Sequence, residues 1–192
     1  MKGFVRLIED IRACELCDDL QLGPRPVLQA HPSARILIVG QAPGTAVHRT
    51  GIPFNDPSGD RLRDWLGVSR ETFYDPHQVA LIPMGFCYPG RGKGGDLPPP
   101  PRCAAAWRTP LLEHLQSVEL TVLVGRYAID WHLPERRRDP LTAVTGDWAS
   151  YLPGLLPLPH PSPRNLMWLR KNPWLEKQVI PVLHKRVARI LK

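Results

Sequence analysis

Four short, uninterrupted apolar runs are spaced along the chain, each bounded by glycine or proline. They cover residues 34–40, 79–85, 120–125 and 154–159. Runs of this length without polar alternation are typical of strands that are buried on both faces of a parallel sheet. Apolar residues at helical spacing predict helices at 2–13, 59–67, 103–117, 125–132 and from about Pro173 onward. This alternation predicts a single α/β domain over residues 1–192, with a short, mostly parallel four-stranded sheet flanked by helices.

The carboxyl ends of parallel strands lie along one edge of a sheet, and ligand sites form in the loops that follow them. The loops that this rule brings together are 40–58, 86–102, 126–127 and 160–165. The first begins with the sequence GQAPG at residues 40–44, and the last is HPSPRN. We therefore expect the chemistry of the protein at this edge.

The charge of the chain is basic and uneven. The formal net charge is +7, the sequence pI is about 9.6, and residues 164–192 hold eight basic residues against Glu176 alone. This tail is either a solvated helix face or a surface that meets phosphates. Hydrophobic residues make up 43%, so the chain can bury a core, and 23 prolines exclude long helices throughout. Without a membrane-length apolar run or a signal-peptide pattern, we expect a cytoplasmic monomer with no membrane partner.

The chain has four cysteines, Cys14, Cys17, Cys87 and Cys103. Disulfides are disfavoured in a reducing compartment, whereas a close CxxC pair with two further thiols suits a tetrahedral four-thiolate centre. Zinc and an iron–sulfur cluster both accept four thiolates, and four unrelated small apolar residues are the simpler alternative. The proline-rich segment 88–102 favours a centre, because a loop with little apolar content needs its ends held.

The first site loop combines a tight turn with an aromatic residue. Two glycines around Pro43 expose backbone N–H groups to a ligand, and the segment lacks both a GxGxxG fingerprint and a GK[ST] ending. Phe54 stands further along the same loop, either as a stacking platform or as a core residue. In the last loop, prolines stiffen the backbone that presents His160 and Arg164.

Together these segments resemble the uracil-DNA glycosylase superfamily. The motif Gly-[Gln/Glu]-x-Pro-[Gly/Tyr] matches residues 40–44, Gly-x-Pro-Phe matches 51–54 and His-Pro-Ser matches 160–162. The extended HPSPRN is similar to the single-strand-selective monofunctional branch, and the cysteine pattern resembles the thermophile-type branch that holds a [4Fe–4S] cluster. The resemblance spans about residues 14–165 and implies a three-layer α/β/α fold.

The resemblance implies a monofunctional DNA glycosylase that flips a deaminated base out of the stack and leaves an abasic site for base excision repair. His160 would donate a hydrogen bond to uracil O2 as the base becomes an anion. Phe54 would stack on the base, and the backbone around Gln41 and Ala42 would contact its edge. The DNA-binding residues would be Ser162, Arg164, Asn165, Lys185 and Arg186. The cluster ligands would be the four cysteines, with Zn²⁺ as the alternative metal.

The sequence departs from the family pattern at three positions. Ala42 replaces a water-orienting aspartate, and Gly44 replaces a tyrosine that excludes thymine. Candidate replacements for the aspartate are Asp56, Gln41 and His48; we favour Asp56, which is also an ordinary turn residue before proline.

The third departure is Pro83, which stands where many relatives have an asparagine that reads uracil. Asn55 or backbone groups would then take over base recognition, and hypoxanthine or xanthine become candidate substrates.

Two other functions compete with this interpretation. One is a weakly active or inactive family member that acts as a nucleic-acid-binding module. The other is a nucleotide-binding α/β enzyme whose GQAPG turn holds a small phosphate ligand. A basic tail favours a polyanion over a small ligand.

Overall fold

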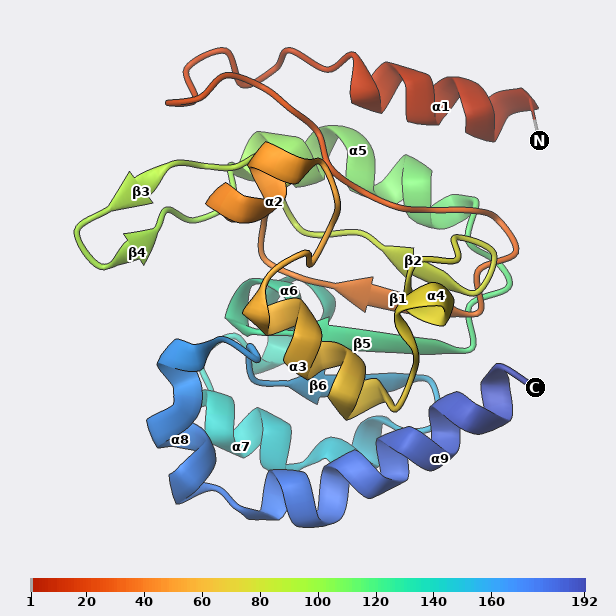
Figure 1. Ribbon diagram of the computed structural model, residues 1–192, viewed down its shortest axis with the longest axis vertical. Helices are drawn as coiled ribbons and strands as arrows, with labels where there is room; N and C mark the ends of the chain where they lie inside the picture. Colours follow the sequence, from red (N-terminus) through yellow and green to blue (C-terminus); the bar gives the residue numbers. More distant parts are fainter. Residues whose placement is uncertain (1) are drawn as a thin grey trace.

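The computed structural model describes residues 2–192 and is built around one sheet of four parallel strands (Figure 1). The strands follow the spatial order β2-β1-β5-β6. Their bounds are Ile36–Val39 for β1, Val79–Leu81 for β2, Leu120–Val124 for β5 and Leu155–Leu158 for β6. In the register, Ile36 lies opposite both Val79 and Leu120. The predicted four-stranded parallel sheet is confirmed, with each strand shorter than its apolar run.

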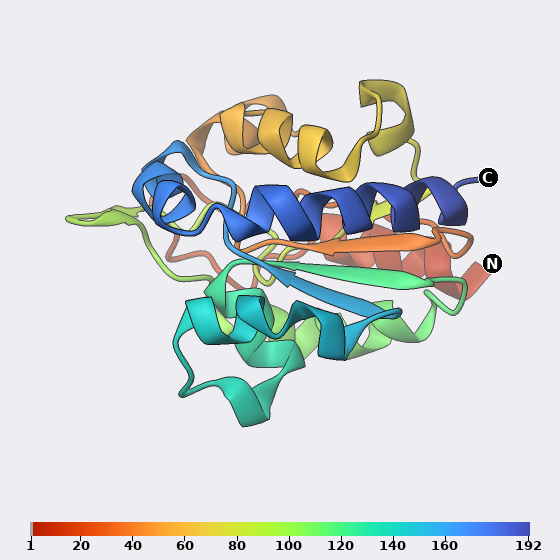
Figure 2. The ribbon, with the colours of Figure 1, turned by 90° about the horizontal axis from the view of Figure 1, so that it is seen from below.

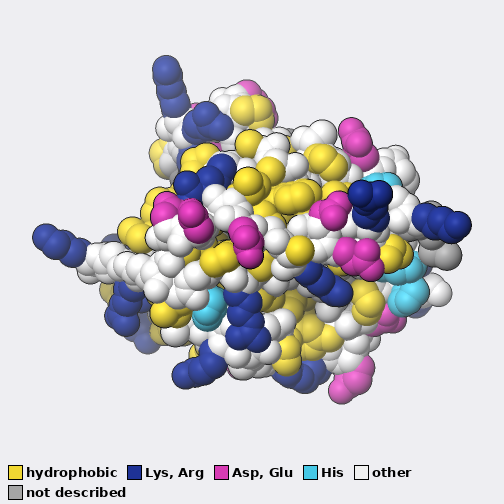
Figure 3. Space-filling model, turned by 90° about the horizontal axis from the view of Figure 1, so that it is seen from above, with side chains coloured by type: hydrophobic (Ala, Val, Ile, Leu, Met, Phe, Trp, Pro, Cys, Tyr) yellow, Lys and Arg dark blue, Asp and Glu magenta, His cyan; other side chains and the backbone are white. Residues whose placement is uncertain are grey.

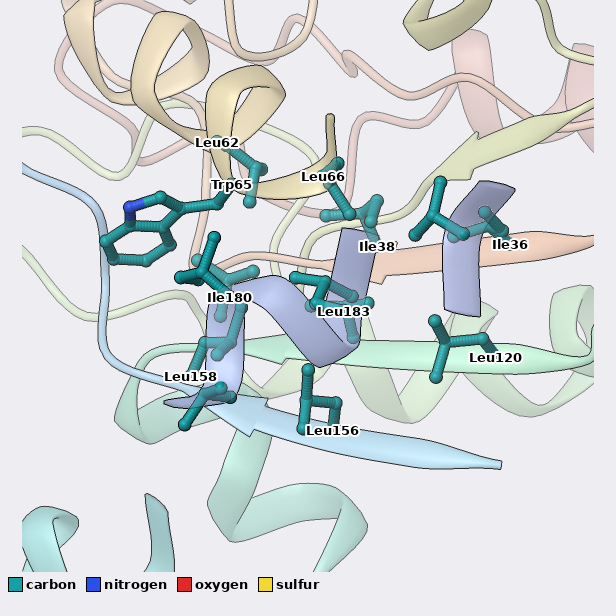
Figure 4. Packing of buried hydrophobic residues seen from close by; sticks show 14 of the residues in the cluster. Ile36, Ile38, Leu62, Trp65, Leu66, Leu120, Leu156, Leu158, Ile180 and Leu183 are labelled. Carbon is teal, nitrogen blue, oxygen red and sulfur yellow. The ribbon is translucent and has the colours of Figure 1, made fainter. Parts of the chain in front are cut away.

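Helices cover both faces of the sheet and complete a three-layer α/β/α arrangement (Figure 2). The first layer contains α3 (Pro57–Leu66) and α9 (Ile180–Ile190). The second contains α1 (Lys2–Arg12), α5 (Pro101–Glu113), α6 (Arg126–His132) and α7 (Leu141–Gly146). Successive strand residues point to opposite faces, so Ile38 packs with α3 and α9 (Figure 4), whereas Leu37 packs with α1 and α5. The apolar runs are continuous because both faces are buried.

Several short elements escaped the sequence prediction. They are α2 (Thr45–Thr50), α4 (Arg70–Phe73), α8 (Leu166–Lys171), three 3-10 turns (Pro134–Arg136, Trp148–Tyr151, Pro163–Asn165) and a hairpin of β3 (Arg91–Gly92) and β4 (Gly95–Asp96). One or two helical turns, or two-residue strands, are too short to show a period. Within residues 2–192, no helix combines the length and apolar character needed to cross a membrane.

The C-terminal helix begins close to its predicted start, but with an irregular first part. Residues Leu175–Val179 form a π-helix that leads into α9. Pro181 lies in the first turn of α9 and has no N–H to donate to the preceding turn. A widened turn ahead of the proline accommodates its ring, as in π-bulges of other helices.

The most unusual core residue is Arg108, which is 1% exposed. Its guanidinium stacks on the Trp131 ring at 4.8 Å, donates to the carbonyl oxygens of Ile82 and Pro83 at 3.5 and 3.4 Å, and donates to His132 Nε2 at 2.8 Å. The histidine ring accepts this bond, so it is neutral. Burial, together with the nearby guanidinium, lowers the pKa of His132 from 6.5 to about 3.

This contact predicts a pH-dependent stability. Below about pH 6.5 the unfolded chain protonates His132 while the folded chain does not, so the free energy of unfolding is fully present above that pH. It falls at about 1.4 kcal/mol per pH unit below it. We expect His132→Gln, which keeps an acceptor for Arg108, to lose this part of the slope in urea unfolding between pH 7.5 and 5. Parallel pH curves for the variant and the parent would contradict the neutral assignment.

Candidate active site at the carboxyl ends of the strands

The loops after the strands enclose a cavity with an inner and an outer part. The inner part is narrow, with a free volume of about 40 Å³, and the outer part measures about 390 Å³. Both parts are lined by Gln41, Ala42, Pro43, Gly44, Asp56, Ser58 and His160. The inner part adds apolar walls from Val27, Val47, Pro53, Phe54 and Pro83. The outer part adds Pro89, Gly94, Gly95, Asp96, Ser162, Arg164 and Asn165. The predicted meeting of the loops after β1, β2 and β6 therefore takes place.

Phe54 forms one wall of the inner pocket and is held in a strained conformation. Its φ is +54°, in the left-handed region that a phenylalanine rarely adopts. Its ring lies against the backbone of Gly40, where a Cβ would come within 2.9 Å of the ring. Its carbonyl oxygen accepts a bond from the Tyr74 hydroxyl at 3.3 Å. Strain of this kind persists only where neighbours enforce it, and it recurs at ligand sites.

Gly59 enforces the conformation of Phe54. A Cβ on Gly59 would lie 1.7 Å from the Phe54 carbonyl oxygen, which no small shift relieves. We expect Gly59→Ala to lower the free energy of unfolding by about 3 kcal/mol or more, measured by urea denaturation. Gly146→Ala is the matched control, because nothing lies within 4 Å of that position. Equal stability of the two variants would show that the loop moves freely.

Asp56 has a structural duty in addition to its place in the cavity. It is the N-cap of α3, where Oδ1 accepts the Gly59 N–H at 2.9 Å. The positive end of the α3 dipole therefore lies at the pocket, with Ser58 in the first turn. The turn role of this aspartate is observed, and its second carboxylate oxygen takes no part in the cap bond.

His160 is held as a neutral imidazole with a defined tautomer. Nδ1 accepts the Ser162 N–H at 3.2 Å, so the ring proton is on Nε2. Burial lowers the pKa of His160, against the opposing effect of the negative charges of Asp56 and Asp96. The loop itself is fixed by Asn165, whose side-chain amide donates to the His160 carbonyl oxygen at 2.7 Å. The result is a rigid N–H donor on the wall of the pocket.

Some predicted site residues lie elsewhere. The Asn55 carboxamide oxygen accepts a bond from Arg70 at 3.2 Å and lines neither part of the cavity. His48 also lines neither part. We therefore leave Asn55 and His48 out of the site.

The basic tail is divided between the two edges of the sheet. Arg164 lines the outer cavity. Arg186 instead donates to the carbonyl oxygen of Glu119 at 3.3 Å, just before β5 begins, and Lys185 is next to it in α9. The C-terminal end of α9 lies at the edge of the sheet opposite the cavity (Figure 1). The structure therefore does not bring Lys185 and Arg186 to the predicted DNA-facing site.

The sequence analysis missed the contribution of the hairpin. β3 and β4 project from the body of the molecule, with a basic side chain at the tip (Figure 3), and the return strand brings Gly95 and Asp96 to the outer cavity. The signal was the run Gly92-Lys93-Gly94-Gly95, since glycine-rich pairs favour two-residue hairpin turns. Val27, Pro53 and Ser58 also line the inner pocket without any motif that would have singled them out.

The four cysteines line a second small, apolar pocket. Three sulfurs accept N–H bonds: Cys14 from the Trp107 indole at 3.2 Å, Cys17 from Arg102 at 3.1 Å and Cys103 from the Phe86 backbone at 3.3 Å. Burial raises the pKa values of Cys87 and Cys103 to about 11. Within residues 2–192, no three His, Cys, Asp or Glu side chains are grouped closely enough to hold a metal ion. The thiols are therefore neighbours in one pocket without a formed metal site.

The fold and the cavity define an α/β protein whose ligand site lies at the carboxyl ends of parallel strands, with an aromatic wall and a neutral histidine. The sequence matches the description Uracil DNA glycosylase superfamily over residues 29–184. This match covers most of the chain, and the protein belongs to that superfamily. The predicted family is confirmed.

Proposed function

We propose that the protein is a DNA glycosylase that hydrolyses the N-glycosidic bond of uracil, or of a related deaminated base, and leaves an abasic site. The observation that supports this most is His160, a neutral N–H donor on the wall of the pocket that Phe54 also lines. The inner pocket suits a flat base in its narrow space, and the outer cavity suits the sugar and phosphates. Flipping is required because the glycosidic bond is unreachable inside a duplex.

The proposed chemistry stabilises a departing anion. As the bond to C1′ breaks, its electron pair stays on the base, and His160 Nε2–H donates a hydrogen bond to the oxygen where negative charge develops. The N-terminus of α3 adds its partial positive charge at the same pocket. Phe54 stacks on the base and the backbone at Gln41 and Ala42 borders its edge. Ser162 and Arg164, in the wall of the outer cavity, contact the DNA backbone and the gap in the stack.

Base recognition is the less conventional part of the proposal. Pro83 lines the inner pocket and offers no side-chain donor, and Asn55 does not replace it. Recognition then falls to Gln41, Ser58 and backbone groups. A pocket with few side-chain donors discriminates weakly among bases with similar edges, which keeps hypoxanthine and xanthine as candidate substrates.

We further propose that the thiol pocket holds a metal centre, either a [4Fe–4S] cluster as in the thermophile-type branch or zinc. The donor set fits, because three of its sulfurs accept N–H bonds, an arrangement that favours thiolates. A bound cation also reverses the cost of ionising buried thiols. The centre would tie the α1 end of the chain to both ends of segment 88–102. Its role would be structural, within one glycosylase-like domain that spans residues 1–192 and acts as a monomer.

Excision assays test the proposed function directly. Labelled single- and double-stranded oligonucleotides carrying one uracil, hypoxanthine or xanthine are incubated with protein purified without oxygen. We expect strand cleavage only after alkali, which would indicate a monofunctional glycosylase and identify its base. Retained DNA binding without excision of any base would instead support a nucleic-acid-binding module, with Ala42 and Pro83 as the cause.

A further inference from the structure

The replacement of the family aspartate by Ala42 leaves the site without an obvious group to orient water. Asp56 is the nearest candidate in the sequence, but its Oδ1 is occupied by the Gly59 N–H as the cap of α3. A carboxylate that already stabilises a helix is less free to turn toward a substrate or to exchange a proton. The structure offers a second carboxylate at the same cavity.

That carboxylate belongs to Asp96, on the return strand of the hairpin. It lines the outer cavity together with His160, and its negative charge acts on His160 from there. It also lies across from Gly44, where a Cβ would be 3.6 Å from Asp96 Oδ2. Among residues 2–192, no hydrogen bond or ion pair engages the Asp96 side chain. The small residue at 44 thus leaves the space that this carboxylate enters.

The hairpin is tied to the first site loop. The Gln41 side-chain amide donates to the carbonyl oxygen of Leu97 at 3.2 Å, immediately after Asp96. Leu97 N–H donates to the Gly90 carbonyl oxygen at 2.9 Å, and the backbone N–H of Arg91 donates to Gln21 Oε1 at 3.1 Å. Arg164 leans over Gly95 from the other side, since a Cβ on that glycine would collide with its guanidinium. Asp96 is therefore presented by a segment held at both ends.

We propose that Asp96 is the carboxylate that orients the attacking water and stabilises the positive charge that develops on the sugar. This inference rests on the proposed glycosylase function. In the step, the C1′–N bond breaks and its electrons leave with the base, while a water oxygen bonds to C1′. Asp96 accepts the proton that the water loses and passes it to solvent, and the base anion takes up a proton. A carboxylate in the outer cavity also favours a cationic sugar by simple attraction.

Asp96→Asn tests this role, with Asp56→Asn in parallel and Asp64→Asn, an exposed aspartate of α3 that lines neither part of the cavity, as control. Asparagine is isosteric, and at position 56 it still caps the helix. Single-turnover excision and DNA affinity are measured for each variant. We expect Asp96→Asn to lower the excision rate about 100-fold with DNA affinity unchanged or higher, and Asp64→Asn to match the parent.

Two results would overturn the inference while leaving the proposed function standing. One is an Asp96→Asn rate within threefold of the parent, or faster, because the carboxylate would then only repel phosphates. The other is a loss confined to Asp56→Asn, which would assign the water to Asp56. A parent protein that excises none of the bases would overturn the proposed function itself, and this inference with it.

Discussion

Replacing His160 with alanine is expected to lower the rate of base excision by about 100- to 1000-fold, the range for loss of one oxyanion-type donor. DNA affinity is expected to stay within about threefold, because phosphate contacts dominate affinity for DNA. The reason is geometric. Ser162 N–H holds His160 Nδ1, so the proton on Nε2 is ready for an anion that exists only as the bond breaks. Such an interaction lowers the barrier without strengthening ground-state binding.

The measurement is single-turnover excision beside equilibrium binding to an oligonucleotide with one uracil. His77→Ala is the control, since His77 is an exposed histidine that lines neither part of the cavity. His160→Gln, which retains an N–H donor, is expected to fall between the parent and the alanine variant. If His160→Ala keeps a rate within a few-fold of the parent, anion stabilisation must come from another group, such as the N-terminus of α3.

Replacing Cys103 with serine is expected to remove the metal centre and to destabilise the protein strongly. Structural metal sites contribute binding energy directly to folding, and at 2–4 °C per kcal/mol a loss of several kcal/mol lowers the unfolding temperature by roughly 10 °C or more. Excision is expected to fall as well, because Cys87 and Cys103 bracket the segment that carries the hairpin to the cavity. Metal content, visible absorption and thermal unfolding of protein purified without oxygen report these effects.

Trp107→Phe provides the graded comparison for this variant. It removes only the indole N–H bond to Cys14 Sγ, so we expect the metal to be retained with a smaller loss of stability. A coloured parent protein would indicate an iron–sulfur cluster, and a colourless one with stoichiometric zinc would indicate the zinc alternative. A metal-free parent that is as stable and active as any metal-loaded sample would mean that the four thiols are simply apolar core residues.

The architecture could be predicted because its signals are local. Continuous apolar runs are required of strands buried on both faces, and helical spacing is required of helices that cover one face, so the layers can be read from periodicity. Short elements gave no such signal, and α2, α4 and the hairpin were missed. The π-helix at Leu175–Val179 depends on Pro181, so its cause was present in the sequence although the periodicity did not show it.

The site could be predicted in part, for the same reason. Parallel strands end at one edge, so the loops that hold Gln41, Phe54 and His160 had to meet there. Side-chain direction was another matter. Asn55 stands next to Phe54 in the sequence but turns to Arg70, and the charge of α9 lies at the far edge because the helix runs the length of the sheet (Figure 1).

The sequence by itself therefore determined the class of fold, the family and the loops that form the cavity, since each follows from local pattern or from motif order. Tertiary structure alone decided which carboxylates reach the cavity and which nitrogen of His160 carries the proton. Asp96 enters the mouth because Gln41 holds Leu97 from 56 positions away. Contacts of that kind depend on how distant segments pack, and no local pattern of residues encodes them.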